Sequence, residues 1–131
     1  MRRALVLARR GWGKTLPNPM VGCVIARGSE ILSEGFHPSF GSPHAEVMAL
    51  GKCPVNLDGA TMYVTLEPCN HYGKTPPCTE AILKSSIRRV VIGAPDPNPS
   101  AAGGAEYLRS KGIRCELGLL ARESRELNRA F

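Results

Sequence analysis

One histidine, two cysteines and a glutamate stand in this chain in an order that suits metal-assisted hydrolysis. His44 and Glu46 flank a single alanine, and Cys69 and Cys78 follow later in the sequence. One imidazole and two thiols can hold a zinc ion by three side chains and leave the fourth position for water, as catalytic zinc sites do. A carboxylate beside that water can carry protons during the reaction. The sequence therefore predicts zinc as the cofactor, with His44, Cys69 and Cys78 as ligands and Glu46 as the catalytic acid and base.

The spacing of the two cysteines departs from the pattern that zinc deaminases share. That pattern is His-x-Glu followed by Pro-Cys-x-x-Cys, whereas eight residues, 70–77, separate Cys69 from Cys78 here. Closing eight residues in place of two costs about 1 kcal/mol more in chain entropy. Zinc binding in finger peptides is worth about 10–16 kcal/mol, so the longer loop is compatible with a zinc site. A loop of this length is also large enough to line a pocket.

Apolar runs and chain breakers predict five strands with helices between them. Strands are expected at 21–26, 31–36, 61–66, 90–92 and 113–117, and helices at 4–10, from 42 or 43 to 51, from 77 to about 85, at 105–111 and from 121. This order implies an α/β fold, a three-layer α/β/α sandwich with a five-stranded mixed sheet. Ligands in such folds bind at the carboxyl ends of strands and the amino ends of helices. His44 and Glu46 fall in the first turn of one expected helix, and Cys78 falls in the first turn of another.

Composition bounds the class of protein. The chain has 131 residues, 43% of them hydrophobic and 21% charged, which fits one globular domain over 1–131. The apolar run 4–8 is too short for a signal peptide, and no stretch approaches a membrane span. Five cysteines, an odd number without paired spacing, argue against a disulfide framework and favour a reduced, cytoplasmic setting. Cys23 and Cys115 lie in apolar runs and are expected in the core.

The net charge of +6 has three interpretations. It could mark a nucleic-acid surface, attract a phosphorylated small molecule, or form an ordinary solvated exterior. The cations are scattered along the chain and the few aromatic residues do not alternate with them, so a stacking platform for single strands is not indicated. We therefore expect a small-molecule partner and no nucleic acid.

Six motifs give the chain a family resemblance over essentially its whole length. They are Pro17-Asn18-Pro19, Val21-Gly22, His44-Ala45-Glu46, the run from Tyr63 to Cys69, the loop from His71 to Cys78, and Asp96-Pro97-Asn98-Pro99. With them the chain resembles the deaminase domain of the bacterial bifunctional riboflavin-biosynthesis deaminase/reductase, in the cytidine-deaminase-like zinc deaminase superfamily. The long loop between the cysteines is specific to this group, since most other zinc deaminases close it with two residues.

The resemblance implies hydrolytic deamination of 2,5-diamino-6-(5-phosphoribosylamino)pyrimidin-4(3H)-one at ring carbon 2, a step of riboflavin biosynthesis. The products would be 5-amino-6-(5-phosphoribosylamino)uracil and ammonia. It also implies a substrate-binding set, which is Asn18, His37, His71, Lys74, Asp96 and Asn98. Lys74 would meet the ribose phosphate, and the alternative for it is a solvent-facing loop lysine. For Asp96 and Asn98 the alternative is turn formation before proline.

Other interpretations stay open on sequence alone. The family commonly continues into a pyridine-nucleotide-dependent reductase domain, and this chain ends at Phe131, near that junction, without a Gly-rich Rossmann loop. We therefore expect an excised domain or a stand-alone deaminase, with the reductase fused or on a separate chain. The resemblance also implies a homo-oligomer. A tRNA or nucleic-acid base deaminase on the same fold is the second hypothesis, which the basic charge favours and the long loop opposes. A catalytically silent zinc domain for assembly is the third, and Glu46 argues against it because a structural site does not need that carboxylate.

Overall fold

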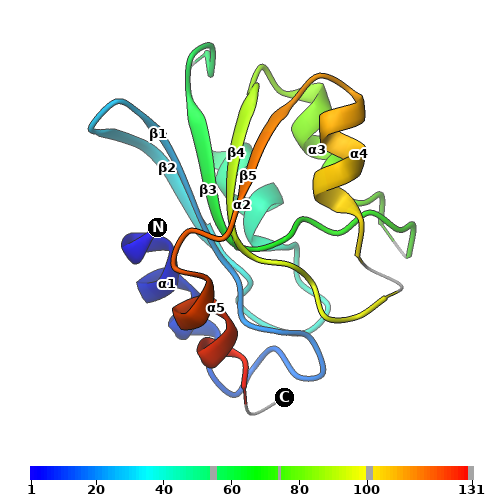
Figure 1. Cartoon of the computed structure of the whole chain (residues 1–131). Coiled ribbons are helices and arrows are strands. Elements are labelled where there is room, and N and C mark those ends of the chain that lie inside the picture. The colour runs from blue at the N-terminus through cyan, green and yellow to red at the C-terminus, as the bar shows by residue number, and fades with distance from the viewer. Residues whose placement is uncertain (54–55, 74, 100–101, 130–131) are drawn as a thin grey trace.

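A five-stranded sheet forms the middle layer of the computed structural model, which describes residues 1–53, 56–73, 75–99 and 102–129 (Figure 1). The strands are β1 (Gly22–Arg27), β2 (Glu30–Phe36), β3 (Thr61–Leu66), β4 (Arg89–Ala94) and β5 (Arg114–Leu117), in the order β2-β1-β3-β4-β5. The helices are α1 (Arg2–Ala8), α2 (Ala45–Lys52), α3 (Cys78–Lys84), α4 (Gly104–Ser110) and α5 (Ala121–Leu127). Helices α1 and α5 cover one face, and α2, α3 and α4 cover the other. This is the expected three-layer α/β/α sandwich.

The sheet is mixed because it contains both antiparallel and parallel strand pairs. β1 and β2 form an antiparallel hairpin through a turn at Gly28, whose φ of 59° is a left-handed conformation that glycine adopts without strain. β3 pairs antiparallel with β1 and parallel with β4, and β4 pairs parallel with β5. Each parallel connection carries a helix, α3 or α4, because parallel neighbours need a crossover.

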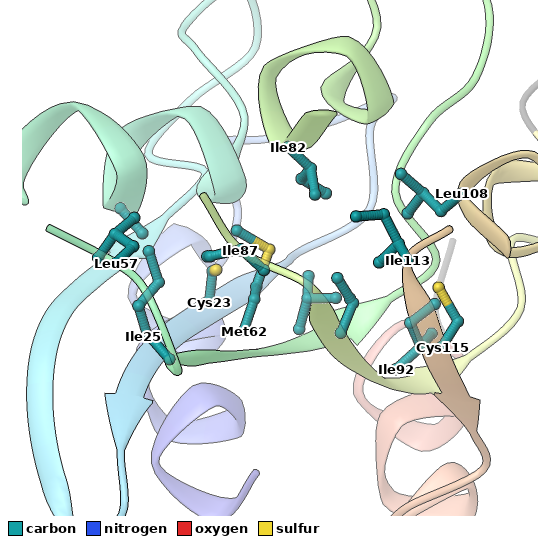
Figure 2. Close-up of a cluster of buried hydrophobic side chains, with 14 of the residues drawn as sticks. Cys23, Ile25, Leu57, Met62, Ile82, Ile87, Ile92, Leu108, Ile113 and Cys115 are labelled. Carbon is teal, nitrogen blue, oxygen red and sulfur yellow. The ribbon is translucent and has the colours of Figure 1, made fainter. Parts of the chain in front are cut away.

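Alternation along the central strands divides the buried side chains between two cores. Ile25 of β1 and Met62 of β3 belong to the larger core under α2, α3 and α4, whereas their neighbours Val24 and Tyr63 pack in the smaller core against α1. Figure 2 shows the larger core, with Met62 on the sheet below Ile82 of α3. Burying one such side chain is worth about 1.5–3 kcal/mol, so a register slip that exposed a whole strand face would be costly.

Four chain segments meet at one edge of this sheet. β3 and β4 are parallel, with Leu66 beside Ala94, so the segments that follow both strands leave at the same edge. β1 runs antiparallel to β3, and its first residue, Gly22, pairs with Phe36 at the carboxyl end of β2. The segment before β1 and the segment after β2 therefore reach the same edge. The topology brings together four stretches that are far apart in the sequence.

The expected elements are all present, with some shifted ends. α1 begins at Arg2 in place of Ala4, and residues Arg9–Gly11 form a 3₁₀ turn that continues it. β4 extends to Ala94, beyond the expected Ile92, because its ladder with β3 continues to that residue. Gly93, a weak strand former, is held there by neighbours that approach its α-carbon closely.

Two expectations about the interior are met. Cys23 and Cys115 lie in the core, with exposures of 0% and 8%. Both therefore behave as small apolar residues and are separate from the thiols expected to bind metal. Among the described residues, no helix combines the length and the apolar character that crossing a bilayer would require.

Gly22 lies where α1 crosses β1, and the crossing leaves no room for a side chain. A Cβ there would overlap the carbonyl oxygen of Ala4, which cannot move without shifting the helix. We expect Gly22→Ala to lower the free energy of unfolding by about 3 kcal/mol, at the upper end for overpacked cores. Gly51→Ala is the control, because nothing lies within 4 Å of its added carbon, and it should stabilise α2 by up to about 1 kcal/mol. Urea denaturation compares the two, and equal midpoints would contradict the tight crossing.

Candidate active site

Three elements bring the predicted zinc ligands to one point at the sheet edge. His44 is the N-cap of α2, Cys69 follows β3, and Cys78 is the first residue of α3. Their ligand atoms all lie within 4.8 Å of one another. Nδ1 of His44 is 3.7 Å from Sγ of Cys69 and 3.3 Å from Sγ of Cys78. The backbone N–H of Cys78 also donates to Sγ of Cys69 at 3.2 Å, which ties the start of α3 to the end of β3.

These separations fit a zinc ion. Zn–S bonds of about 2.3 Å and Zn–N bonds of about 2.0–2.1 Å, at tetrahedral angles, place donor atoms about 3.5–3.8 Å apart. The observed nitrogen-to-sulfur distances of 3.3 and 3.7 Å lie close to that range. Two thiolates and one imidazole are also a donor set that zinc takes in catalytic sites, where water occupies the fourth position. The residues present can therefore hold zinc with one position free.

A shared hydrogen bond distinguishes the two thiols. The thiol of Cys78 donates to Cys69, and this bond, with help from His44, lowers the pKa of Cys69 to about 4. The same bond, together with burial, raises the pKa of Cys78. Cys69 is thus the thiol that loses its proton more readily. Because a metal ligand must be deprotonated, zinc binding would release a proton from Cys78.

Glu46 lies in the first turn of α2 and lines the same cavity as His44 and Cys69. Its exposed fraction is 3%. Burial raises the pKa of Glu46 to about 7, against the opposing effects of its own backbone N–H and of His44. A buried carboxyl in the same cavity as two of the three candidate ligands is the arrangement that a proton carrier beside a metal-bound water would need.

Asn18 and His37 form a linked pair on the cavity wall. Nδ2 of Asn18 lies 3.3 Å from Nε2 of His37, and Nδ1 of His37 lies 3.1 Å from the carbonyl oxygen of Pro43. That carbonyl can only accept, so Nδ1 carries the proton and Nε2 accepts from the Asn18 amide. Burial lowers the pKa of His37, which favours the neutral ring that this pattern needs. His37 is only 2% exposed and both nitrogens are engaged, so its direct contact with a ligand stays a prediction.

Asp96, which follows β4, and Glu67, which follows β3, line the cavity and are linked to each other. The Asp96 carboxylate accepts the N–H of Asn98 at 2.9 Å, which is the turn chemistry expected of this segment. Glu67, 8% exposed, accepts the N–H groups of Asp96 at 3.2 Å and of Ala105 at 2.9 Å. Burial raises the pKa of Asp96, and the nearby Glu67 adds to the shift. Asp96 and Asn98 nevertheless line the cavity, so the turn and a binding role are compatible.

The cavity has a volume of about 650 Å³, within the range of about 300–1,000 Å³ typical of small-molecule sites. The predicted residues on its wall are Asn18, His37, His44, Glu46, Cys69, His71, Asp96 and Asn98. Lys74 lies outside the described residues. The described part of the chain thus brings to one cavity five of the six residues expected to contact substrate.

Sequence reasoning missed the contribution of α5. Ser124, Arg125 and Asn128, the last at the carboxyl end of the helix, also line the cavity. The signal that could have found them is the pair of polar residues Ser124 and Asn128, four apart and so on one face of a helix. That spacing does not say which surface the face covers.

Known proteins resemble this chain over its whole length. The family model for the cytidine and deoxycytidylate deaminase zinc-binding region matches residues 1–94. A diaminohydroxyphosphoribosylamino-pyrimidine deaminase of Buchnera aphidicola subsp. Schizaphis graminum is 48% identical over 132 residues, which cover 100% of this chain and 90% of that protein. The riboflavin biosynthesis protein RibD of Synechocystis is 52% identical over 132 residues, covering 100% of this chain and 36% of that protein.

A crystal structure of a relative shows the same architecture. The diaminohydroxyphosphoribosylaminopyrimidine deaminase/5-amino-6-(5-phosphoribosylamino)uracil reductase of Thermotoga maritima matches with a TM-score of 0.95 and 49% identity, over 98% of this chain and 38% of that one. The chain spans 36% and 38% of these two longer relatives, and most of the shorter Buchnera deaminase. With its fold, its donor trio and these matches, the chain belongs to the cytidine and deoxycytidylate deaminase zinc-binding family, among the deaminase domains of RibD type.

Proposed function

We propose that this protein deaminates 2,5-diamino-6-(5-phosphoribosylamino)pyrimidin-4(3H)-one to 5-amino-6-(5-phosphoribosylamino)uracil in riboflavin biosynthesis. The observation that carries the proposal is the buried carboxyl of Glu46 on the wall of the cavity that His44 and Cys69 also line. A zinc site that only stabilised the fold would need neither this carboxyl nor an open cavity beside it. The substrate follows from the Buchnera and Thermotoga relatives, which are named for this deamination.

Glu46 would carry the protons of the reaction. Zinc held by His44, Cys69 and Cys78 would supply the Lewis acidity that makes water nucleophilic near neutral pH. Glu46 would accept a proton from the water that attacks ring carbon 2 and deliver it to the neighbouring ring nitrogen. It would then pass the second proton of that water to the amine, which leaves as ammonia while the new C=O forms. With 3% exposure, Glu46 is shielded from bulk water during these transfers.

Asn18 would read the polar edge of the pyrimidine. Its Nδ2 is committed to His37, so its Oδ1 remains as an acceptor for an N–H group of the ring or of the amine. Turning the amide over would set Oδ1 against the unprotonated nitrogen of His37, two acceptors face to face. His37 therefore fixes which polar atom Asn18 offers, and a ligand with an N–H donor at that position is favoured.

Cations near the cavity suit a phosphorylated substrate. Arg125 and His71 line its wall, and Lys74 stands three positions after His71 in the sequence. A ribosyl phosphate carries close to two negative charges at neutral pH, and arginine and lysine bind such groups by charge-assisted hydrogen bonds. This supports the phosphoribosyl form of the pyrimidine over the free base.

The proposal also covers where the protein works and which partners it has. Thiols that bind zinc must stay reduced, which favours a cytoplasmic location. A reductase for the next step would be fused to this domain or carried on a separate chain, because the RibD relatives are longer than the segment matched here. A homo-oligomer, which the family resemblance implies, is the expected state in solution, and light scattering would test it.

Ammonia release from the diaminopyrimidine ribosyl phosphate tests the function. We expect turnover by zinc-loaded protein and a loss of at least about a hundredfold after chelation, since the metal activates the water. Adding back zinc should restore activity. The chelated and reloaded samples of one preparation are each other's control, provided that circular dichroism shows both to be folded.

No release by folded protein with stoichiometric zinc would overturn the proposal. The second hypothesis, a nucleic-acid base deaminase, would then be tested by tRNA binding at several salt concentrations, because phosphate contacts make affinity fall steeply with salt. A protein that bound zinc but acted on neither substrate would fit the third hypothesis, an assembly domain.

A further inference from the structure

Asn128 holds a segment of main chain that lies 108 residues away in the sequence. Its Oδ1 accepts the N–H of Met20 at 2.7 Å, and its Nδ2 donates to the carbonyl oxygen of Met20 at 3.0 Å. The carboxamide thus makes the two bonds that a residue of a neighbouring strand would make. In Figure 1 the end of α5 lies beside the stretch of chain that leads into β1.

Met20 depends on these bonds. It is 1% exposed, so water cannot satisfy its main-chain groups, and β1 begins only at Gly22. A buried N–H or C=O without a partner destabilises the folded state. Among the described residues, Asn128 is the partner that the structure gives to both groups of Met20. Without Asn128, the main-chain groups of Met20 would find hydrogen-bond partners only by moving toward water, so this part of the chain would shift.

Met20 stands two residues after Asn18, which we propose reads the pyrimidine. On the other side, Asn18 is held by a turn, because its N–H donates to the carbonyl of Thr15 at 2.7 Å and its own carbonyl accepts from Oγ1 of Thr15 at 2.9 Å. The turn fixes the local shape of the loop but does not attach it to the sheet. Asn128 provides an attachment on the downstream side.

α5 itself packs on the sheet against β4, the strand that leads to Asp96. Ser124 is 1% exposed and packs on Gly93 of β4 so closely that a Cβ at Gly93 would overlap its Oγ. β4 leads directly to Asp96, which also lines the cavity. Asn128 therefore links the Asn18 wall, through α5 and β4, to the Asp96 wall. The distance between these walls decides whether one ligand can contact both.

We propose that Asn128 is a positioning residue for substrate binding, which acts by holding Met20 and thereby placing Asn18 in the cavity. This inference rests on the proposed function for its substrate. Glu46 and the metal-binding trio lie on other elements and make no hydrogen bond with Asn128 in the described structure. Loss of Asn128 should thus weaken substrate binding more than the proton transfers.

Steady-state kinetics of Asn128→Ala and Asn128→Asp tests the inference. Alanine removes both bonds, and aspartate keeps the acceptor but sets an oxygen against the carbonyl of Met20. Because losing one neutral hydrogen bond to a ligand weakens binding by up to about tenfold, we expect KM to rise by about that factor in both variants. The kcat at saturation should stay within about twofold, and zinc per chain should not change. Arg122→Ala, an exposed change on the same helix and outside the cavity wall, is the matched control and should keep the wild-type KM.

Hydrogen exchange of residues 17–22 gives a readout that does not depend on turnover. Faster exchange at Met20 in Asn128→Ala, with unchanged exchange in the strands, would show release of this segment. Unchanged KM or unchanged exchange at Met20 would overturn the inference. So would a fall in kcat that follows lost zinc or a lowered Tm, because that would mean general destabilisation. If the wild type itself released no ammonia, the proposed function would fail, and exchange would still decide whether Asn128 holds the loop.

Discussion

Glu46→Gln is expected to lower kcat by about a thousandfold while the protein stays folded and keeps its zinc. Glutamine matches the shape of glutamate but cannot accept and return a proton, and positioned proton transfer contributes about 10²–10⁴-fold in enzymes. Folding should survive, because Glu46 is buried and burial raises its pKa to about 7, so an uncharged side chain is no burden there. Ammonia release and zinc per chain, measured on the same sample, check both halves of the expectation.

Glu80→Gln is the matched control for this change. Glu80 occupies the first turn of α3 as Glu46 occupies the first turn of α2, but it accepts a hydrogen bond from Tyr107 at 2.8 Å and is not on the cavity wall. Glutamine can still accept that bond, so the control should keep normal kcat. If Glu46→Gln turned over at the wild-type rate, the mechanism would be wrong and another group would have to move the protons. Loss of zinc from Glu46→Gln would instead assign Glu46 to the metal site.

Cys78→Ser should remove zinc and, with it, both activity and the stability that the metal adds. Changing even an outer-sphere partner of a metal site weakens affinity by about 10–100-fold, and a direct ligand should exceed about a hundredfold. We expect less than about a tenth of the wild-type zinc per chain after dialysis, measured by elemental analysis, and no detectable ammonia release.

Chelation shows whether a loss of stability in Cys78→Ser comes from the missing metal or from altered packing. A ligand that binds only the folded state raises Tm, so chelator should lower the Tm of the wild type. The same treatment should leave the Tm of Cys78→Ser unchanged, because little zinc remains to be removed. Cys53→Ser is the control: Cys53 lies outside the trio and should retain one zinc per chain. Full zinc in Cys78→Ser, or a further chelator-induced drop in its Tm, would show that Cys78 is not a ligand.

The elements of the fold were predictable because their signals are local. The run Thr61–Leu66 alternates between two cores and becomes β3 with the expected bounds. Pro77 marks the start of α3, since proline suits the end of a loop before a helix and cannot continue a strand. Where a boundary was wrong, a neighbour decided it: β4 reaches Ala94 because β3 lies alongside, which no pattern within 89–94 reveals.

That the candidate site residues come together was predictable for a related reason. His44, Glu46, Cys69 and Cys78 are few, reactive and fixed in spacing, and each stands at the start of a helix or after a strand. Such positions converge at one edge of an α/β sheet whatever the details of packing. A zinc site restricts the arrangement of these residues further, because its three donor atoms must lie within a few ångströms of one another.

The sequence by itself therefore determined the candidate metal-binding trio, the family and the layered fold, because these depend on residue type and short-range order. Only the tertiary structure decided that both ring nitrogens of His37 are engaged, by Asn18 and by the carbonyl of Pro43. It also decided that Glu67 accepts the main-chain N–H of Asp96 and that Asn128 bonds both main-chain groups of Met20. These contacts join residues that are 6 to 108 positions apart in the sequence. They depend on where whole helices and loops come to rest, and a polar side chain carries no sign in the sequence of the distant backbone group that it will meet.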